Sequence, residues 1–182
     1  MKKVVLTFGL ISGAISAVFM FATLPFHDKI GFDKGVYVGY SAMVLAFLLV
    51  FFGIRSYRDN VGGGYISFGR AFSVGILITL ISCACYVIAW EIIYFNFMPD
   101  FVEKYSTYIV EKARNSGASP EDIAKQVESM KNFKAMYDKP LWNVLMTFME
   151  PLPVGLLVTL VSALILRKKR KALNGEEQLA TS

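Results

Sequence analysis

Two carboxylates and one imidazole are the side chains of this sequence whose types and surroundings could do chemistry. Glu150 lies in the stretch FMEPLPVG, within a long run that has no other charged residue, and is followed by Pro151 and Pro153. Glu91 lies at the end of another apolar run, and His27 is the single histidine. Carboxylates and imidazole can bind a proton or a cation. Glu150, Glu91 and His27 are therefore a candidate proton or ion site.

Two interpretations of Glu150 are open. In the first, a helix begins at Pro151 and Glu150 lies at its N-terminus. Proline fits the first helical position, and a carboxylate there meets free backbone N–H groups and the positive end of the helix. In the second, Pro151 and Pro153 break a helix inside a membrane, and Glu150 faces the other helices or a cavity. Intramembrane acids are costly, which makes them functional candidates.

The depth of the candidate residues follows from helix geometry. At 1.5 Å per residue, Glu150 lies about 25 Å from Arg167, and Glu91 lies about 31 Å from Arg70. A bilayer has a hydrocarbon core of about 30 Å, so both acids are expected toward the face opposite these arginines. His27 is near enough in depth to join them.

The sequence has no recognisable catalytic or metal-binding motif. It lacks a GxSxG elbow, an HExxH pair and a phosphate-binding glycine loop, and a single histidine removes most acid–base schemes. The three candidate residues are too scattered for a metal motif. Cys83 and Cys85, two positions apart on a helix, point to different faces and cannot form a disulfide with each other. We expect a non-enzymatic protein without a metal or cofactor.

Four apolar segments have to position these residues. The chain has 182 residues, of which 55% are hydrophobic and only 18% charged. Each segment is close to the roughly 20 apolar residues that a helix needs to cross a bilayer, and lipid offers an unpaired backbone no hydrogen-bond partners. We predict an all-α polytopic membrane protein with four transmembrane helices in a single domain, 1–171, and a polar tail, 172–182. The predicted spans are about 4–24, 36–54, 71–91 and 146–166.

Residues 99–139 are the one long polar segment, and they predict a helical hairpin outside the membrane between the third and fourth spans. Apolar residues recur at helical spacing in each half of the segment. Between the halves, Gly117 suits a helix end, and Ser119, Pro120 and Asp122 suit a helix start. The apolar stripes either pack within the protein or form a surface for a partner or for lipid headgroups.

Basic residues predict the orientation. They flank the apolar segments on one side, which places both termini in the cytoplasm. The residues expected to set topology or contact lipid headgroups include Arg70, Arg167, Lys168, Lys169, Arg170 and Lys171. The basic composition is thus explained by topology and need not indicate nucleic-acid binding.

Small residues recur every four positions in the first and fourth segments, for example at Gly9, Gly13, Gly155 and Thr159. Such rows allow helix backbones to approach closely. They fit a compact bundle, and equally an interface between copies of the chain or with another membrane protein.

Several motifs in combination resemble a known family. FFGIRSYRD, ISFGRAF, the polar hairpin, the Glu-Pro element and the basic end are similar to small bacterial four-span membrane proteins known as a domain of unknown function. The resemblance runs from Lys2 to about Lys171. It implies the four-span topology and no activity, substrate or catalytic residue.

Two functions are therefore expected from the sequence. The first is a non-enzymatic accessory or assembly component that acts through helix packing and the hairpin, with the lipid bilayer and other membrane proteins as partners. The second is a small transporter or ion-conducting protein that uses Glu150 and Glu91.

Overall fold

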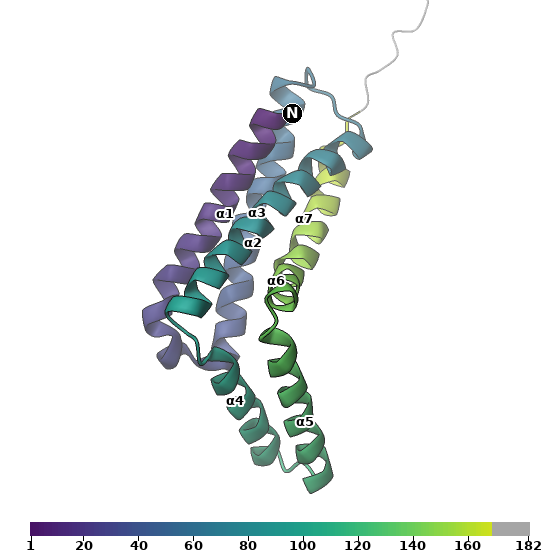
Figure 1. Ribbon diagram of the computed structural model, residues 1–182. Coiled ribbons are helices and arrows are strands. Elements are labelled where there is room, and N and C mark those ends of the chain that lie inside the picture. Colours follow the sequence, from purple (N-terminus) through teal and green to yellow (C-terminus); the bar gives the residue numbers. More distant parts are fainter. Residues whose placement is uncertain (169–182) are drawn as a thin grey trace, which may run out of the picture.

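The computed structural model describes residues 1–168, and these residues form an elongated helical molecule (Figure 1). The prediction of an all-α fold is confirmed. The elements are α1 (Lys2–Thr23), η1 (Leu24–Phe26), α2 (His27–Asn60), α3 (Phe68–Asn96), α4 (Phe101–Asn115), α5 (Pro120–Tyr137), α6 (Pro140–Met149) and α7 (Pro151–Leu166). The predicted headgroup residues Lys169, Arg170 and Lys171 and the tail 172–182 lie outside the described residues.

α1, α2, α3 and α7 lie side by side in one bundle. Glycines bring these helices close together, because a Cβ added to Gly9 would lie 2.8 Å from Ile81 of α3. A Cβ added to Gly155 of α7 would overlap the side chain of Thr79 of α3. The small-residue rows predicted from the sequence are thus used for packing within the chain.

Buried hydroxyl groups add hydrogen bonds between the same helices. The Ser12 hydroxyl donates to the Ala46 carbonyl at 2.9 Å and lies 2.9 Å from the Ser82 hydroxyl. The hydroxyls of Thr79 and Thr159 are 3.0 Å apart. Each of these four hydroxyl groups therefore has a partner on a neighbouring helix, which lowers the cost of burying it in an apolar interior.

The connection between α1 and α2 differs from a simple loop between two spans. Residues 24–26 form η1, and α2 begins at His27, so the chain stays helical while it reverses direction. Within α2 the backbone leaves helical geometry at Gly31, with φ 69° and ψ 169°. Glycine has no Cβ and adopts this positive φ without strain, which explains how a sharp bend fits inside a nearly continuous helix.

The ends of the bundle helices that carry basic residues are tied together. Ile66, just before α3, exchanges two backbone hydrogen bonds with Lys168, just after α7, at 3.1 and 2.9 Å. Gly63 and Gly64 adopt positive φ in the link from α2 to α3. The Lys168 ammonium lies 5.6 Å from the centre of the Tyr65 ring. We refer to this region as the basic end.

At the opposite end the chain leaves the bundle as α4 and returns as α5 and α6. α4 and α5 pack on each other, and α6 packs on α3, α5 and α7. Gly117 takes a positive φ in the turn after α4, and the Ser119 hydroxyl caps α5 by accepting from the Asp122 N–H at 3.1 Å. We refer to α4 and α5 together as the distal helix pair.

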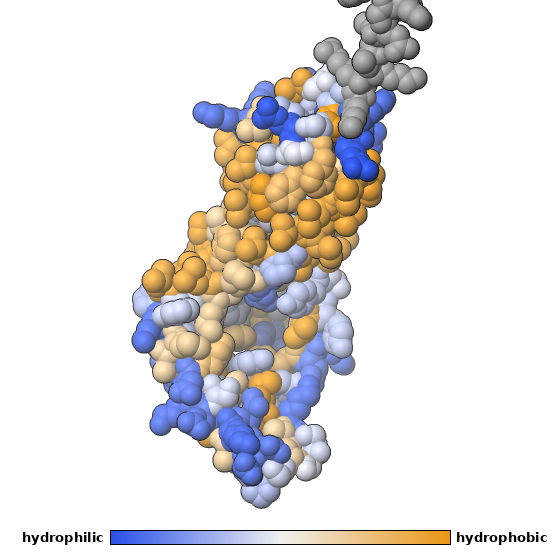
Figure 2. Space-filling view, turned by 90° about the vertical axis from the view of Figure 1, so that its right-hand side faces the viewer, coloured by the Kyte–Doolittle hydropathy of each residue, from blue (hydrophilic) through white to orange (hydrophobic). Residues whose placement is uncertain are grey.

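The bundle exposes large apolar side chains along its length. Figure 2 shows an apolar surface between two polar ends, the basic end and the distal helix pair. Three continuous helical stretches are long and apolar enough to cross a membrane: Lys2–Asn60, Phe68–Asn96 and Pro140–Leu166. The first of them contains both α1 and α2. In each stretch, half or more of the most apolar window lies unburied, which fits a surface that faces lipid.

Candidate functional site

A cavity of about 500 Å³ lies where the bundle meets the distal helix pair. Its walls come from the end of α1, the first part of α2, the last part of α3, and from α4, α5 and α6. In Figure 2 the surface is hollowed near the level at which apolar surface gives way to polar surface. Sites that bind drug-sized ligands commonly have volumes of about 300 to 1,000 Å³, and this cavity lies within that range.

Glu150 reaches this cavity from the junction of α6 and α7. Its backbone is helical, with φ −71° and ψ −56°, and its side chain makes no hydrogen bond that caps α7. Instead, the Tyr86 hydroxyl of α3 donates to Glu150 Oε2 at 2.9 Å. Glu150 is exposed, and it is one of the residues that line the cavity. Although α7 does begin at Pro151, the carboxylate is thus directed to α3 and the cavity.

His27 also lines the cavity, from the start of α2. Its Nδ1 is buried without a hydrogen-bond partner among the described residues and lies 3.8 Å from the Asp28 carboxylate. The imidazole packs edge-on against Phe32 and Phe101, with ring centres 5.4 and 6.1 Å away. The imidazole therefore lies within an aromatic wall of the cavity.

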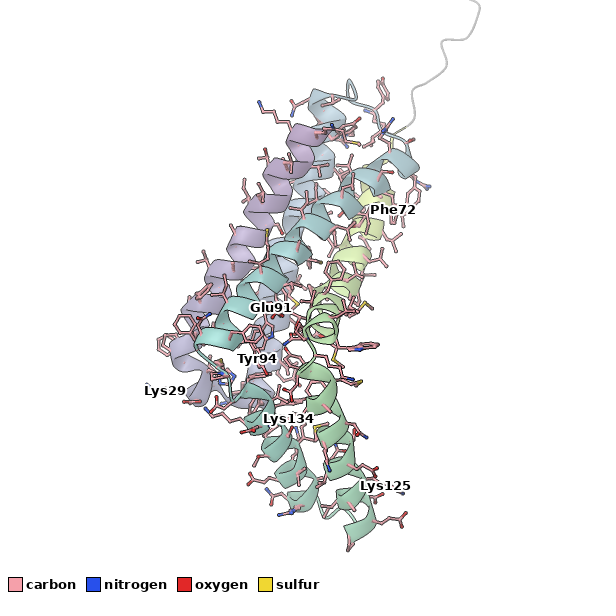
Figure 3. All side chains as sticks on the ribbon, viewed as in Figure 1. Lys29, Phe72, Glu91, Tyr94, Lys125 and Lys134 are labelled. Carbon is pink, nitrogen blue, oxygen red and sulfur yellow. The ribbon has the colours of Figure 1, made fainter. Side chains whose placement is uncertain are left out.

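Glu91 is not one of the described residues that line the cavity. Figure 3 shows Glu91 and Tyr94 near the end of α3 at which the chain leaves the bundle. Glu91 Oε1 is buried and has no hydrogen-bond partner within residues 1–168. Of the three candidate residues, the structure thus brings Glu150 and His27 to one cavity and leaves Glu91 outside it.

Aromatic side chains form much of the cavity wall beyond Glu150. The Trp90 indole donates to the Tyr137 hydroxyl at 2.6 Å, which joins α3 to α5, and packs against Phe101 at 4.9 Å between ring centres. Trp90 lies one helical turn after Tyr86, so the two residues follow the same face of α3. The further aromatic residues of the wall are Phe19, Phe32, Tyr105 and Phe133.

A row of glycines on α2 forms the wall of the cavity that the sequence analysis missed. Gly31, Gly35 and Gly39 line the cavity, and no atom of the described residues lies within 4 Å of a Cβ added to any of them. The only sign of this glycine face in the sequence is the four-residue spacing of the glycines in GFDKGVYVG. It resembles the spacing of Gly9 and Gly13, which contact α3, so spacing alone does not separate a packed face from an open one.

Ion pairs hold the distal helix pair together and to α2. The Lys112 ammonium of α4 donates to Asp33 of α2 at 2.5 Å and to the Tyr108 hydroxyl at 3.0 Å. The hydrogen bond between Lys112 and Asp33 lowers the pKa of the Asp33 carboxyl below its ordinary value and raises the pKa of the Lys112 ammonium above its ordinary value. Lys134 of α5 pairs with Glu103 of α4.

The basic end brings together residues that are distant in sequence. Arg70 lies in the first turn of α3, and one guanidinium nitrogen is 3.8 Å from the Met1 sulfur. Arg167 and Lys168 directly follow α7, and all three basic side chains are exposed. Arg55 and Arg58, near the end of α2, each approach Asp59.

No cluster suited to a metal ion is present in the described part of the chain: within it, no three His, Cys, Asp or Glu side chains converge. Cys83 is buried, Cys85 is partly buried, and both are free thiols. The chemistry available at the cavity is therefore that of one carboxylate, one imidazole, several hydroxyl groups and aromatic rings.

The described residues form an all-helical bundle that has an extensive apolar surface and three stretches long and apolar enough to cross a membrane, features that are typical of helical membrane proteins. The chain belongs to the family described as Protein of unknown function (DUF4199), whose sequence profile matches residues 7–168. The resemblance to a domain of unknown function is thereby confirmed. No curated protein and no solved structure matches the chain.

Proposed function

We propose that the chain is a multi-pass protein of a bacterial cytoplasmic membrane with four spans: α1, α2, α3, and α6 with α7. Both termini then lie in the cytoplasm, and the distal helix pair lies on the opposite side. The apolar surface between two polar ends supports this arrangement. The gathering of basic residues at one end supports the orientation, because basic residues favour the cytoplasmic side.

Within that membrane, the protein acts as a non-enzymatic accessory protein that binds a small ligand. The observation that carries this proposal is the cavity of about 500 Å³, whose walls come from six helices. A mostly aromatic and aliphatic wall with a few polar groups is typical of small-molecule sites. The polar groups at the wall form no arrangement of nucleophile, base and oxyanion donors, which favours binding over catalysis.

A neutral, environment-sensitive probe tests this proposal. N-phenyl-1-naphthylamine should bind to the purified protein in detergent micelles, with fluorescence above that of protein-free micelles. Gly39→Phe should abolish this binding because its side chain would enter the open space at α2. Gly69→Phe is the matched control, since Gly69 also faces open space but lies at the basic end. Equal binding by both variants would contradict a ligand site in the cavity.

Transport is a second candidate function, favoured by the position of Glu150 at the cavity. If the protein moves protons or cations through this site, Glu150→Gln should abolish a proton- or cation-dependent flux into vesicles. Glu91→Gln should leave the flux unchanged, because Glu91 does not line the cavity within the described residues. If Glu150→Gln had the same flux as the unmodified protein, transport through this site would be ruled out.

An assembly role through helix packing is the remaining expectation. The rows of Gly9, Gly13 and Gly155 support it less than the sequence suggested, because they contact helices of the same chain. Oligomeric state in mild detergent tests it directly.

A further inference from the structure

We infer that the cavity takes an apolar organic cation, with its positive group at Glu150 and its apolar groups against the aromatic wall. This inference rests on the proposed ligand-binding function and names the chemical class of the ligand. The inferred ligand is a small molecule whose positive charge is delocalised or shielded by hydrocarbon groups, such as a substituted ammonium or phosphonium ion.

The charges at the cavity select a cation. Glu150 supplies the only carboxylate among the described residues that line it, and no lysine or arginine is among them. An anionic ligand would therefore meet a carboxylate and no lysine or arginine side chain among the described residues of the wall. A charge removed from water needs a partner of opposite sign, and Glu150 can be that partner only for a cation.

The hydrogen bond from Tyr86 prepares Glu150 for this role. Tyr86 donates to Oε2, while Oε1 makes no hydrogen bond within residues 1–168. The Tyr86 hydroxyl thus restrains the orientation of a carboxylate that lines the cavity and leaves its other oxygen available to a ligand. A carboxylate fixed in advance loses less conformational entropy when a ligand binds.

The aromatic wall suits the rest of such a ligand. Trp90 lies one turn beyond Tyr86 on α3, and Phe101 packs against it at 4.9 Å between ring centres. Aromatic faces attract cations within about 6 Å of the ring centre and also bury hydrocarbon groups. The Trp90 indole N–H is already bonded to Tyr137, so the indole presents little unpaired polarity to an apolar ligand.

The size and shape of the cavity fit this class. A volume of about 500 Å³ exceeds what a metal ion or a simple ammonium ion would fill. The absence of side chains at Gly35 and Gly39 leaves room for bulky hydrocarbon groups on the α2 side. The inferred ligand is therefore larger and more apolar than an inorganic cation.

Tetraphenylphosphonium and tetraphenylborate provide a matched test, because they have similar shapes and opposite charges. Trp142→Phe leaves Trp90 as the only tryptophan, so the fluorescence of Trp90 reports directly on the cavity. In this background, in zwitterionic detergent, tetraphenylphosphonium should bind at least about tenfold more tightly than tetraphenylborate. Glu150→Gln should weaken phosphonium binding by at least about tenfold, as expected for the loss of a desolvated charge partner.

Controls separate this inference from the proposed function. Glu150→Gln should still bind the neutral N-phenyl-1-naphthylamine, which shows that the cavity is intact. Glu91→Gln should keep full phosphonium affinity. If the neutral probe binds but phosphonium shows no preference over borate, or no dependence on Glu150, the inference is overturned and the proposed function stands. If neither the neutral probe nor the phosphonium binds, both are overturned.

Discussion

Tyr86 and Glu150, 64 residues apart in sequence, are joined by a hydrogen bond of 2.9 Å at the cavity. The bond connects the last part of α3 to the junction of α6 and α7. It also gives a carboxylate in an apolar stretch a specific partner, which matters because unpaired polar groups are costly there.

Removal of the Tyr86 hydroxyl should destabilise the protein. In Tyr86→Phe, Glu150 loses its donor, and the expected loss of unfolding free energy is about 1 to 3 kcal/mol. Reversible unfolding in mixed detergent micelles, followed by circular dichroism, measures this loss. In a double-mutant cycle with Glu150→Leu, whose side chain cannot accept the hydrogen bond, the two effects should not add, because the residues share one interaction. Strict additivity would show that the hydrogen bond contributes nothing.

Two glycine-to-alanine substitutions should have opposite effects. Gly155→Ala should destabilise the protein by about 1 to 3 kcal/mol, because the added methyl group would overlap Thr79. Gly39→Ala should be neutral or stabilise by up to about 1 kcal/mol, because its methyl group would meet open space and alanine favours the helix. The same unfolding assay compares the variants. Destabilisation by Gly39→Ala comparable to that of Gly155→Ala would contradict an open face on α2.

The contact between α2 and α4 should depend on pH. The pKa of Asp33 is lowered, so its contribution is complete above its unfolded value near about 4 and is lost as pH falls through the lower folded value. The pKa of Lys112 is raised, so its contribution is complete below about 10.4 and is lost as pH rises through the higher folded value. The ion pair should therefore be intact between about pH 4 and pH 10.

Spin labels at the exposed positions Lys34 and Glu111 can measure this contact by pulsed electron resonance. The distance distribution should be narrow at pH 6 and should broaden in strong acid, in high salt and in Asp33→Asn. Sensitivity to salt is expected because both partners are exposed. A distribution unchanged by Asp33→Asn would mean that other contacts hold α4 in place.

The proposed topology predicts which engineered cysteines react in intact cells. Lys125→Cys, on α5, should react with a membrane-impermeant maleimide, whereas Lys3→Cys, at the basic end, should react only after the cells are permeabilised. The protein without engineered cysteines is the control for background labelling of Cys83, which is buried, and of Cys85. The reverse pattern would invert the orientation.

The fold class could be predicted because its signals are local. The length of the apolar runs indicated helices, and Ser119 with Pro120 indicated a helix start at the position where α5 begins. The connection between α1 and α2 was harder to predict from the sequence, because its residues form helix up to and beyond Gly31. The reversal of chain direction there depends on how α1 and α2 pack on each other.

The cavity could not be predicted because it depends on relationships between distant segments. Gly9 and Gly39 occur in rows with the same spacing, yet Gly9 contacts α3 whereas Gly39 faces open space. The sequence likewise placed Glu150 and Glu91 at similar depth but did not specify the faces of their helices. Glu150 lines the cavity and Glu91 does not, because of how α3 is oriented about its own axis and where α6 meets α7. Local helix propensity determines neither of these features.

The two backbone hydrogen bonds between Ile66 and Lys168 have a mechanical consequence. They fasten α3 to α7 at one end of the molecule, while the cavity, with walls that include α2 and α6, lies at the other end of the bundle. Gly39 lies 21 residues before Asn60, so a tilt of α2 by about 5° about its basic end would move Gly39 by about 3 Å, at 1.5 Å per residue. A small tilt of α2 relative to the joined helices α3 and α7 would therefore change the width of the cavity.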